Sequence, residues 1–294
     1  MGETLELTAP PWHLVLVPSI GGAVSRLCLA GHDVLRPLPE ERGATTEAIR
    51  HSAGYMLAPY SNRIADATFL WDGEVVRLAR NFGDHPHSLH GIAWQRSWMA
   101  EERDAGQVSL VLDHPGDIDW PWRCRLRQLW QLKGACLTLQ LEIENRDNRD
   151  MPAGLGWHPY FLREGLEVSF LCNGVWLSDA RQLPERHVSI PADWDFSVQR
   201  PVGEPGLDHC FTGWARKVHL AWPDRGLAVD MTASEVLSRL VVFTPKERDF
   251  VGIEPVSHTS NALNMADPAT AGMHRLAPGE RLVGHIHLTG EVAA

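Results

Sequence analysis

The sequence predicts an all-β protein, built as an antiparallel sandwich or barrel. Three observations support this class. Apolar and polar residues alternate over many short segments, turn-forming residues separate those segments, and long amphipathic helical patterns are scarce. A parallel sheet is disfavoured because it requires helices that alternate with the strands. The 294 residues contain no repeat and no Ser/Gly linker, so we expect one domain that spans residues 1–294.

The clearest β pattern is a long hairpin near the middle of the chain. Residues 137–144 read Leu-Thr-Leu-Gln-Leu-Glu-Ile-Glu, which places the four aliphatic side chains on one face. Residues 122–132 also alternate and precede this segment across Lys133-Gly134, so the two segments are expected to pair as antiparallel strands. Between the β-prone residues of Leu70–Val75, Asp72-Gly73 predicts a second hairpin turn.

Short strands are also expected before, between and after these hairpins. Turns such as residues 223–226, Pro-Asp-Arg-Gly, separate neighbouring segments, and Pro39–Arg50 is the stretch in which a short helix is expected. The expected strands are Trp12–Val17, Val24–Leu29, Val108–Leu112, Leu166–Leu171, Val218–Trp222, Leu227–Met231, Leu240–Phe243, Phe250–Glu254 and Leu282–Leu288.

The charge balance is acidic and limits the classes of partner. The chain has 27 Lys and Arg residues against 37 Asp and Glu residues, a formal net charge of −10. Nucleic acids and anionic membrane surfaces both reward clustered cations, so we expect neither as the main partner. No apolar run is long enough for a membrane-spanning helix, and residues 1–4 lack the cationic and apolar regions of a signal peptide.

Cysteine usage indicates a reducing compartment. The five cysteines are odd in number, widely scattered and never arranged as C-x-x-C. Reduced, mostly buried thiols fit this pattern better than a disulfide framework does. Together with the N-terminal residues, the cysteines predict a cytoplasmic protein. The sequence leaves its oligomeric state unknown.

Three histidines lie close together in residues 85–90, which read His-Pro-His-Ser-Leu-His. Such a density suggests a metal site, but the spacing does not match a standard zinc pattern, and Asp84 is the one carboxylate at ligand spacing. We therefore expect no metal here. The alternative is a loop in which one histidine makes a hydrogen bond to a ligand.

Two further segments place ionisable side chains among apolar neighbours. His158 lies between Trp157 and Pro159, and the residue before a proline favours an extended backbone. Glu254 ends the apolar segment Phe250–Glu254, where partial burial raises the pKa of a carboxyl toward that of a useful base. Each residue alone also fits a structural role. Their combination favours an acid/base site.

In order along the chain, these segments resemble the motifs of the aldose 1-epimerase (galactose mutarotase) family. The resemblance covers about residues 10–290. It implies a large antiparallel β-sandwich of the galactose-mutarotase type, with an open cleft for a small sugar and no cofactor. The matching segments are Asn62-Arg63-Ile64, His90-Gly91 followed by Trp94 and Trp98, Trp157–Phe161, Asp208–Phe211, Gly252–Pro255 followed by Asn261–Asn264, and Leu276–Glu280.

The resemblance also implies a role for each of five residues. Glu254 matches the general base that takes the proton from the anomeric hydroxyl, and His158 matches the general acid that protonates the ring oxygen. Arg63 and His90 match residues that bind the sugar and steady the charge that develops on its oxygens. Asp208 matches a carboxylate that holds sugar hydroxyls. The implied activity is an isomerase that interconverts the α and β anomers of a hexose or related aldose.

The sequence departs from the family pattern at two places. Ile92 stands where the family often has a second glycine after the His-Gly pair, so the loop around His90 is expected to differ. Trp157 and Pro159 flank His158, where the family often has Asn or Thr beside the histidine. This second form also resembles the branch of the family that contains hexose-6-phosphate epimerases.

Two alternatives to an epimerase that acts on a free aldose are an epimerase that acts on a hexose 6-phosphate and a protein that only binds carbohydrate. A hexose 6-phosphate needs a cluster of cations for its phosphate, with Arg50, Arg63 and Arg96 as candidates, although the net charge of −10 does not favour it. A non-catalytic carbohydrate-binding protein of the same fold has no need for the acid/base pair. Trp94 and Trp98 are expected either to line the sugar cleft or to fill the core.

Overall fold

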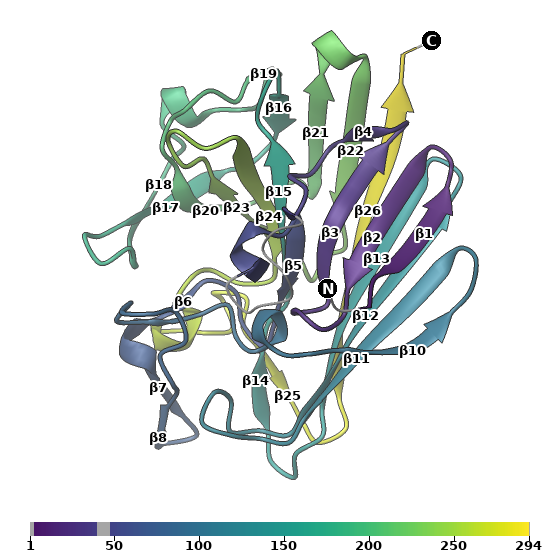
Figure 1. Ribbon diagram of the computed structural model, residues 1–294. Coiled ribbons are helices and arrows are strands. Elements are labelled where there is room, and N and C mark those ends of the chain that lie inside the picture. The colour runs from purple at the N-terminus through teal and green to yellow at the C-terminus, as the bar shows by residue number, and fades with distance from the viewer. Residues whose placement is uncertain (1–2, 40–47, 294) are drawn as a thin grey trace.

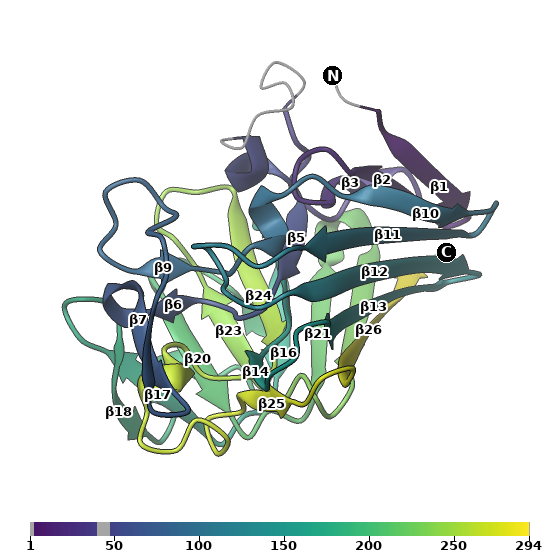
Figure 2. The same ribbon diagram turned by 90° about the horizontal axis from the view of Figure 1, so that it is seen from below.

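The structure is a computed structural model that describes residues 3–39 and 48–293. Two large sheets account for most of it, and all paired strands within them are antiparallel (Figures 1 and 2). Among the described residues, the helical segments are single turns of 3-10 helix. They are η2 (Ala48–His51), η3 (Ala65–Ala67), η4 (Ala93–Gln95), η5 (Ala192–Trp194), η6 (Pro223–Arg225) and η7 (Ala262–Asn264).

The first sheet has eleven strands and carries the candidate site. Ten of them follow the order β1-β2-β3-β5-β15-β24-β23-β20-β17-β18, and β4 pairs with β3. Their bounds are β1 (Leu5–Ala9), β2 (Trp12–Val17), β3 (Ala23–Leu29), β4 (His32–Asp33), β5 (Gly54–Leu57), β15 (Gly156–Leu162), β24 (Phe250–Val256), β23 (Arg239–Phe243), β20 (Asp208–Thr212), β17 (Gly174–Ser178) and β18 (Pro184–Val188).

The second sheet has nine strands in the order β10-β11-β12-β13-β26-β22-β21-β16-β19. Figure 2 shows β10, β11, β12, β13 and β26 lying side by side. The bounds are β10 (Met99–Arg103), β11 (Gln107–His114), β12 (Cys124–Lys133), β13 (Cys136–Asn145), β26 (Arg281–Val292), β22 (Leu227–Ala233), β21 (Lys217–Trp222), β16 (Glu167–Phe170) and β19 (Arg200–Pro201).

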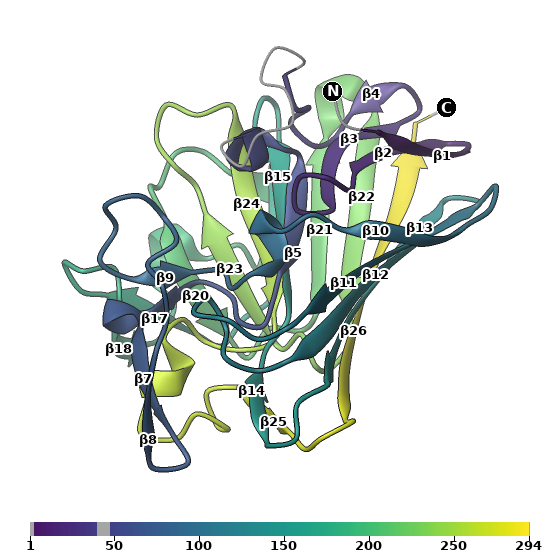
Figure 3. The same cartoon turned by 60° about the horizontal axis from the view of Figure 1, so that its bottom comes forward.

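Three two-stranded ladders complete the fold. The one that matters for the site joins β6 (Arg63–Ile64) to β9 (Ser88–Leu89), and β7 (Thr68–Trp71) pairs with β8 (Glu74–Arg77) between them. Figure 3 shows the segment from β6 to β9 on the side of the molecule that carries β17, β18 and β20, away from β1 and β10. The third ladder joins β14 (Met151–Ala153) to β25 (His274–Leu276).

The fold class expected from the sequence is confirmed. The long hairpin is β12–β13, whose register pairs Lys133 with Cys136, and the Asp72-Gly73 turn joins β7 to β8. Each of the nine further expected strands overlaps an observed strand. The helix expected in Pro39–Arg50 falls largely on residues 40–47, which lie outside the described residues, and Ala48–His51 form a 3-10 turn. Within residues 3–39 and 48–293, no helix has the length and hydrophobicity that crossing a membrane requires.

The main core lies between the two sheets. It draws aliphatic residues from the inward face of β13 and aromatic residues from β12 and β15. The indoles of Trp130 and Trp157 meet edge-on across the interface, at an angle of 72°. Apolar area removed from water contributes about 25 cal/mol per Å², so this layer dominates the stability of the fold.

The centre of the eleven-stranded sheet is buried on its other face as well. Along β15, Trp157 and Phe161 join the main core, whereas Tyr160 joins a second, smaller apolar cluster on the outer face. Strands buried on both faces lose the apolar–polar alternation. For this reason the sequence pattern missed β15 and its neighbour β5.

We expect Leu139→Ala to destabilise the protein by about 2–5 kcal/mol. The Leu139 side chain is fully buried at the middle of β13, so truncation leaves a cavity between the sheets. Denaturant unfolding of the two proteins measures the difference. The control is Gln131→Ala on the neighbouring strand, an exposed position where the change in unfolding free energy should stay within about 0.5 kcal/mol. Equal losses in both variants would contradict this account of the core.

Candidate functional site

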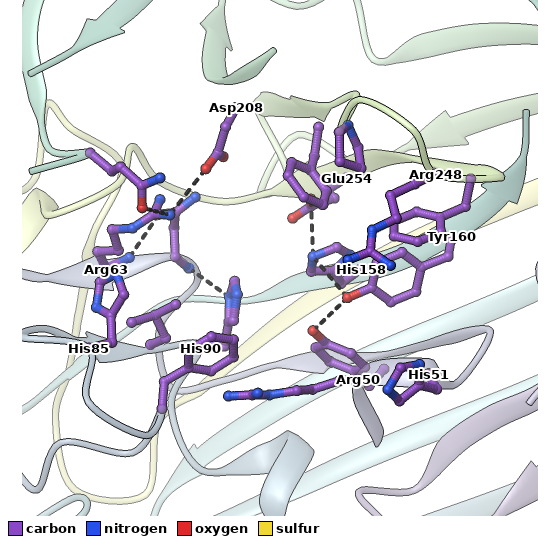
Figure 4. Close-up of a pocket in the computed structure, with 18 of the residues that line it drawn as sticks. Arg50, His51, Arg63, His85, His90, His158, Tyr160, Asp208, Arg248 and Glu254 are labelled. Atoms are coloured by element: carbon purple, nitrogen blue, oxygen red, sulfur yellow. Dashed lines mark hydrogen bonds and ion pairs between the residues drawn. The ribbon is translucent and has the colours of Figure 1, made fainter. Parts of the chain in front are cut away.

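A cavity of about 540 Å³ opens on the outer face of the eleven-stranded sheet. Its floor is formed by β15, β24 and β20, and the loops that surround β6 and β9 form part of its wall (Figure 4). The five residues that the family resemblance singled out, Arg63, His90, His158, Asp208 and Glu254, all line this one cavity. The chain therefore brings together side chains that are up to 191 positions apart in sequence.

His158 and Glu254 face each other across two paired strands. The register pairs Gly156 with Val256 and Tyr160 with Gly252, which places His158 directly opposite Glu254. The His158 Nε2 and the Glu254 Oε1 lie 3.3 Å apart, and both side chains are buried. Glu254 lies within β24, two residues before its end, so the expectation that it ends the strand was wrong.

A glycine keeps the contact between these two side chains open. Gly252 lies on the same face of β24 as Glu254, and a Cβ at this position would lie 2.9 Å from the Glu254 Oε1 and 3.4 Å from the His158 Cε1. Any larger residue would therefore push against both members of the pair. The glycine of the Gly252–Pro255 motif has a packing reason at the site.

Burial shifts the two groups of the pair in opposite directions. Removal from water raises the pKa of Glu254 well above its usual value, with the Asp208 carboxylate as the second cause. Removal from water also lowers the pKa of His158 well below its usual value, and the nearby His90 and Arg36 act in the same direction. In both cases burial disfavours the charged form. The pair therefore favours a neutral carboxylic acid beside a neutral imidazole, with the carboxyl proton in the contact between the two side chains.

Two tyrosines extend this contact into a buried chain. The Tyr160 hydroxyl lies 3.4 Å from the His158 Nε2 and 2.9 Å from the Tyr55 hydroxyl (Figure 4). The Tyr160 ring also packs against the His158 imidazole, with ring centres 4.4 Å apart. The imidazole is held on this side by a hydroxyl and by a ring face, and its rotamer is restricted accordingly.

His90 is held by reciprocal hydrogen bonds with Asn62. The His90 backbone N–H donates to the Asn62 carbonyl (2.8 Å), and the Asn62 backbone N–H donates to the His90 Nδ1 (3.1 Å). Because Nδ1 accepts, the proton of the neutral ring is on Nε2. Burial, with Arg63 as a second cause, lowers the pKa of His90 to about 3. His90 is therefore a neutral hydrogen-bond donor near neutral pH.

The loop around His90 departs from the family pattern without losing its anchor. His90 and Gly91 both have positive φ angles, and a Cβ at Gly91 would lie 2.2 Å from the Ala58 carbonyl oxygen, so glycine is required there. The Ile92 backbone N–H donates to that same carbonyl, and the Ile92 side chain is buried in the main core. The buried Ile92 side chain thus anchors the loop around His90 to the main core.

Arg63 and Asp208 form the opposite wall of the cavity. The Arg63 guanidinium donates to the Asp208 carboxylate at 3.1 Å, to the Gln182 side-chain oxygen at 2.6 Å and to the Asn62 side-chain oxygen at 3.0 Å. The Arg63 Nε is buried and has no hydrogen-bond partner among the described residues. This arrangement sets a guanidinium beside a carboxylate in the cavity wall, and such a donor–acceptor pair suits the binding of vicinal hydroxyls.

The segment that carries Arg63 is clamped by the residues after β24. The Asn261 backbone N–H donates to the Arg63 carbonyl, and the Asn261 side-chain oxygen accepts from Ala65. The Ser61 backbone N–H donates to the His258 Nε2 at 3.0 Å. The Asn261–Asn264 motif therefore positions Arg63, and it does so from outside the cavity.

The three clustered histidines have separate surroundings. His90 belongs to the cavity as described, and His85 lines the same cavity. His87 is fully buried, where its Nδ1 accepts from the Asp66 backbone N–H and its Nε2 lies 3.2 Å from the Arg181 carbonyl. In the part of the chain that the structure describes, no group of three or more His, Cys, Asp or Glu side chains is arranged to hold a metal ion.

Trp94 and Trp98 both fill the core. Their side chains are 2% and 3% exposed, and neither lines the cavity. Trp94 stacks on Tyr55 and meets His90 edge-on, so it supports the cavity wall from behind.

All five cysteines are free, and three of them are buried, as the sequence predicted.

Sequence reasoning missed several residues of the cavity. Tyr55 carries no motif of its own and lies on β5, which the sequence pattern did not reveal. Gln182 and Arg248 lie in loops that precede β18 and β24. Only the aromatic character of residues 157–161 pointed toward the wall that Tyr160 forms. The long loops gave no periodic signal that could have been read.

Comparison with known proteins was decisive for the family. The sequence profile described as aldose 1-epimerase matches residues 3–289. The chain belongs to the aldose 1-epimerase family.

Curated relatives of this family member include proteins with and without an assigned activity. The uncharacterized protein YphB of Escherichia coli is 26% identical over 280 residues, which cover 92% of this chain and 93% of that protein. An aldose 1-epimerase of Haemophilus influenzae is 26% identical over 227 residues, which cover 65% of this chain and 63% of that protein.

Solved structures share the fold of this aldose 1-epimerase family member. A putative aldose 1-epimerase from Escherichia coli superposes with a TM-score of 0.89 at 24% identity and covers 99% of both chains. A galactose 1-epimerase from Lactobacillus acidophilus superposes with a TM-score of 0.82 at 16% identity, covering 99% of this chain and 95% of that one. The galactose-mutarotase type of β-sandwich expected from the motifs is confirmed.

We expect Glu254→Gln to stabilise this family member increasingly as pH rises. Because the folded-state pKa of Glu254 is raised, the folded and unfolded states bind the same number of protons below the unfolded pKa, near 4.5. Above that pH the unfolded state gains by ionising the carboxyl while the folded state resists it. Each unit of pKa difference corresponds to about 1.4 kcal/mol, so the melting temperature of the variant should exceed that of the wild type by at least about 2 °C at pH 8.

The same melting experiment at pH 4 provides the internal reference, because there the advantage of Glu254→Gln should vanish. A matched control is Glu144→Gln, which removes another buried carboxylate but one that pairs with Arg146 and Arg281. That variant should gain no stability at either pH. A difference between Glu254→Gln and wild type that is independent of pH would contradict a raised pKa at Glu254.

Proposed function

We propose that this protein is an aldose 1-epimerase that interconverts the α and β anomers of an aldose by acid/base-catalysed ring opening. One observation carries the proposal. A carboxyl and an imidazole are buried 3.3 Å apart at the floor of a cavity of about 540 Å³, and their pKa values are shifted in opposite directions. Titratable groups whose pKa values are strongly perturbed by burial at the floor of a cavity are typical of acid/base partners.

Ring opening needs one proton removed and one delivered. Transfer of the Glu254 carboxyl proton to the His158 Nε2 first gives an ion pair. Glu254, now a carboxylate, takes the proton from the anomeric hydroxyl, while protonated His158 gives its Nε2 proton to the ring oxygen, and the bond between C1 and the ring oxygen breaks. The products are an open-chain aldehyde, a neutral carboxylic acid and a neutral imidazole. The burial that disfavours both charges therefore favours the protonation state that ring opening produces.

Closure runs the two transfers in reverse. Rotation about the C1–C2 bond presents the other face of the aldehyde. His158 then takes the proton from the hydroxyl that was the ring oxygen, and Glu254 gives its proton to the carbonyl oxygen as the ring closes. Neither residue is consumed. His90, as a neutral donor, and the Arg63 guanidinium steady the sugar oxygens, and the Asp208 carboxylate accepts from sugar hydroxyls.

A purely carbohydrate-binding protein of the same fold is the alternative, and the buried pair argues against it. Desolvating two ionisable groups costs free energy, and hydrogen-bonding groups without titratable protons would bind hydroxyls at a smaller cost. The Tyr160 hydroxyl and ring also restrict the orientation of the His158 imidazole. A protein that only binds sugar has no need to orient that ring.

We expect Glu254→Gln to lower kcat by roughly 10²–10⁴-fold, the usual contribution of a positioned general base. Polarimetry on freshly dissolved α-D-glucose and α-D-galactose measures the approach to equilibrium above the spontaneous rate. Glu144→Gln is the control, because Glu144 is a similarly buried glutamate outside the cavity. A Glu254→Gln variant with near wild-type turnover would falsify the assignment of the base.

We expect His158→Asn to lower kcat by a similar factor with little change in KM, because the imidazole acts on the ring oxygen in the transition state. The same polarimetric assay over a range of sugar concentrations separates the two constants. His32→Asn, at an exposed position on β4, serves as the control. A large rise in KM with kcat preserved would instead make His158 a sugar-binding residue.

A further inference from the structure

One histidine of the cavity wall takes no part in the acid/base chemistry. His85 lines the cavity together with His90, and its side chain is half-buried. Figure 4 shows His85 on the side that carries Arg63 and Asp208, away from Tyr160. An imidazole in this position is open to direct contact with a ligand. The hydrogen bond that it can make depends on which of its two nitrogens is available.

A backbone contact decides which nitrogen of His85 is available. The His87 backbone N–H donates to the His85 Nδ1 at 3.2 Å. A ring nitrogen that accepts carries no proton, so the proton of the neutral ring is on Nε2. A charged imidazole also carries a proton on Nε2. His85 therefore presents a donor at Nε2 in either protonation state, and within residues 3–39 and 48–293 no group accepts a hydrogen bond from it.

The three clustered histidines share this arrangement but differ in the use of Nε2. In each of them, Nδ1 accepts a hydrogen bond from a backbone N–H. The Nε2 of His87 donates to the Arg181 carbonyl at 3.2 Å, so His87 is a structural link between two loops. The Nε2 of His90 remains as a donor for the sugar in the proposed function. His85 matches His90 in this respect, because it also lines the cavity with an unused Nε2.

We propose that His85 is a specificity-determining residue whose Nε2–H donates to the hydroxyl on C3 or C4 of the aldose. The inference rests on the proposed function and concerns the same cavity. His158 and Glu254 act on the ring oxygen and on the hydroxyl of C1, so this end of the pyranose ring lies at the pair. C3 and C4 are the ring atoms opposite the ring oxygen and C1. They extend toward the wall that His85 shares with Arg63 and Asp208.

The His85 ring is held in place by the protein itself. It meets the Phe82 ring edge-on, with ring centres 6.1 Å apart and planes at 89°, and it meets the His87 ring at 5.2 Å and 68°. The His85 backbone N–H donates to the Phe82 carbonyl at 3.1 Å. His87 is fully buried and anchors the turn that carries His85. A donor fixed in this way loses less side-chain entropy when a ligand binds.

The variant His85→Asn separates a sugar contact from a loop contact. The asparagine side-chain oxygen replaces Nδ1 as acceptor for the N–H two residues later, a contact that asparagine commonly makes in turns. The asparagine side chain ends short of the position of Nε2, so the donor toward the cavity is lost. The melting temperature should therefore stay within about 2 °C of that of the wild type.

The test follows mutarotation of sugars that each lack one hydroxyl. Polarimetry compares glucose or galactose, whichever reacts faster, with its 2-, 3-, 4- and 6-deoxy forms for the wild type and His85→Asn. Removal of the contacted hydroxyl costs the wild type a hydrogen bond that the variant has already lost. The ratio of kcat/KM for the parent sugar to that for its 3- or 4-deoxy form should therefore be roughly three- to tenfold smaller in His85→Asn. The ratios for the 2- and 6-deoxy forms should be the same in both proteins.

His32→Asn is the matched control. It makes the same replacement at an exposed histidine on β4, outside the cavity, and should leave all four ratios unchanged. Equal ratios in the wild type and His85→Asn overturn the sugar contact at His85. A change confined to the 2-deoxy or 6-deoxy form overturns the assignment to C3 or C4.

Titration calorimetry with the same sugars distinguishes failure of this inference from failure of the proposed function. If the wild type binds sugar without accelerating mutarotation, the proposed function fails. A roughly three- to tenfold binding preference for the parent sugar over its 3- or 4-deoxy form, absent from His85→Asn, then still supports the contact. If the wild type accelerates mutarotation and the ratios do not change, the proposed function stands and this inference fails. A wild type that binds none of these sugars overturns both.

Discussion

The Glu254–His158 contact depends on a sheet that is buried on both faces. Main-chain pairing of β15 with β24 sets the two side chains directly opposite each other, and Gly252 leaves the space in which they meet. On one face the main core packs against Trp157, and on the other a second apolar cluster surrounds Tyr160. Both faces of these strands are largely shielded from water, and the cavity opens over the pair on the outer face. The same burial that stabilises the sheet shifts the pKa values of the pair.

The burial that suits the pair for acid/base chemistry also lowers the stability of the protein. Two ionisable groups without full hydrogen-bond partners are unfavourable in an apolar layer, and the His158 Nδ1 has no partner among the described residues. Elsewhere the chain fulfils the polar needs of its site closely, as in the reciprocal bonds between Asn62 and His90, which hold two residues with positive φ angles. Strained backbone supported in this way is common at functional sites. For the His158–Glu254 pair itself, the fold supplies no full set of hydrogen bonds to offset the cost of desolvation.

Charge is distributed very unevenly over the molecule. The sequence as a whole is acidic, and a reading of net charge alone argues against any anionic ligand. Folding nevertheless gathers Arg36, Arg50, Arg63 and Arg248, which are up to 212 positions apart in sequence, around one cavity. Arg36 then serves the backbone of η2, and Asp208 neutralises Arg63, so the cations divide into those that build the site and those at its mouth. A ligand senses this local field, and the total charge has little bearing on it.

The sequence by itself determined the fold class, and its resemblance to the family singled out five residues that all line one cavity. Alternation in residues 137–144 and the turns beside it specify antiparallel strands from local rules, and short motifs mark Arg63, His90, His158, Asp208 and Glu254. Local patterns fail for β5 and β15, because strands with two buried faces no longer alternate. Tertiary structure alone decided that Trp94 supports the site from behind, that Tyr55 joins the buried chain and that Arg248 lines the cavity whereas Arg96 does not. These outcomes depend on contacts between residues far apart in the chain, which no periodicity within a segment encodes.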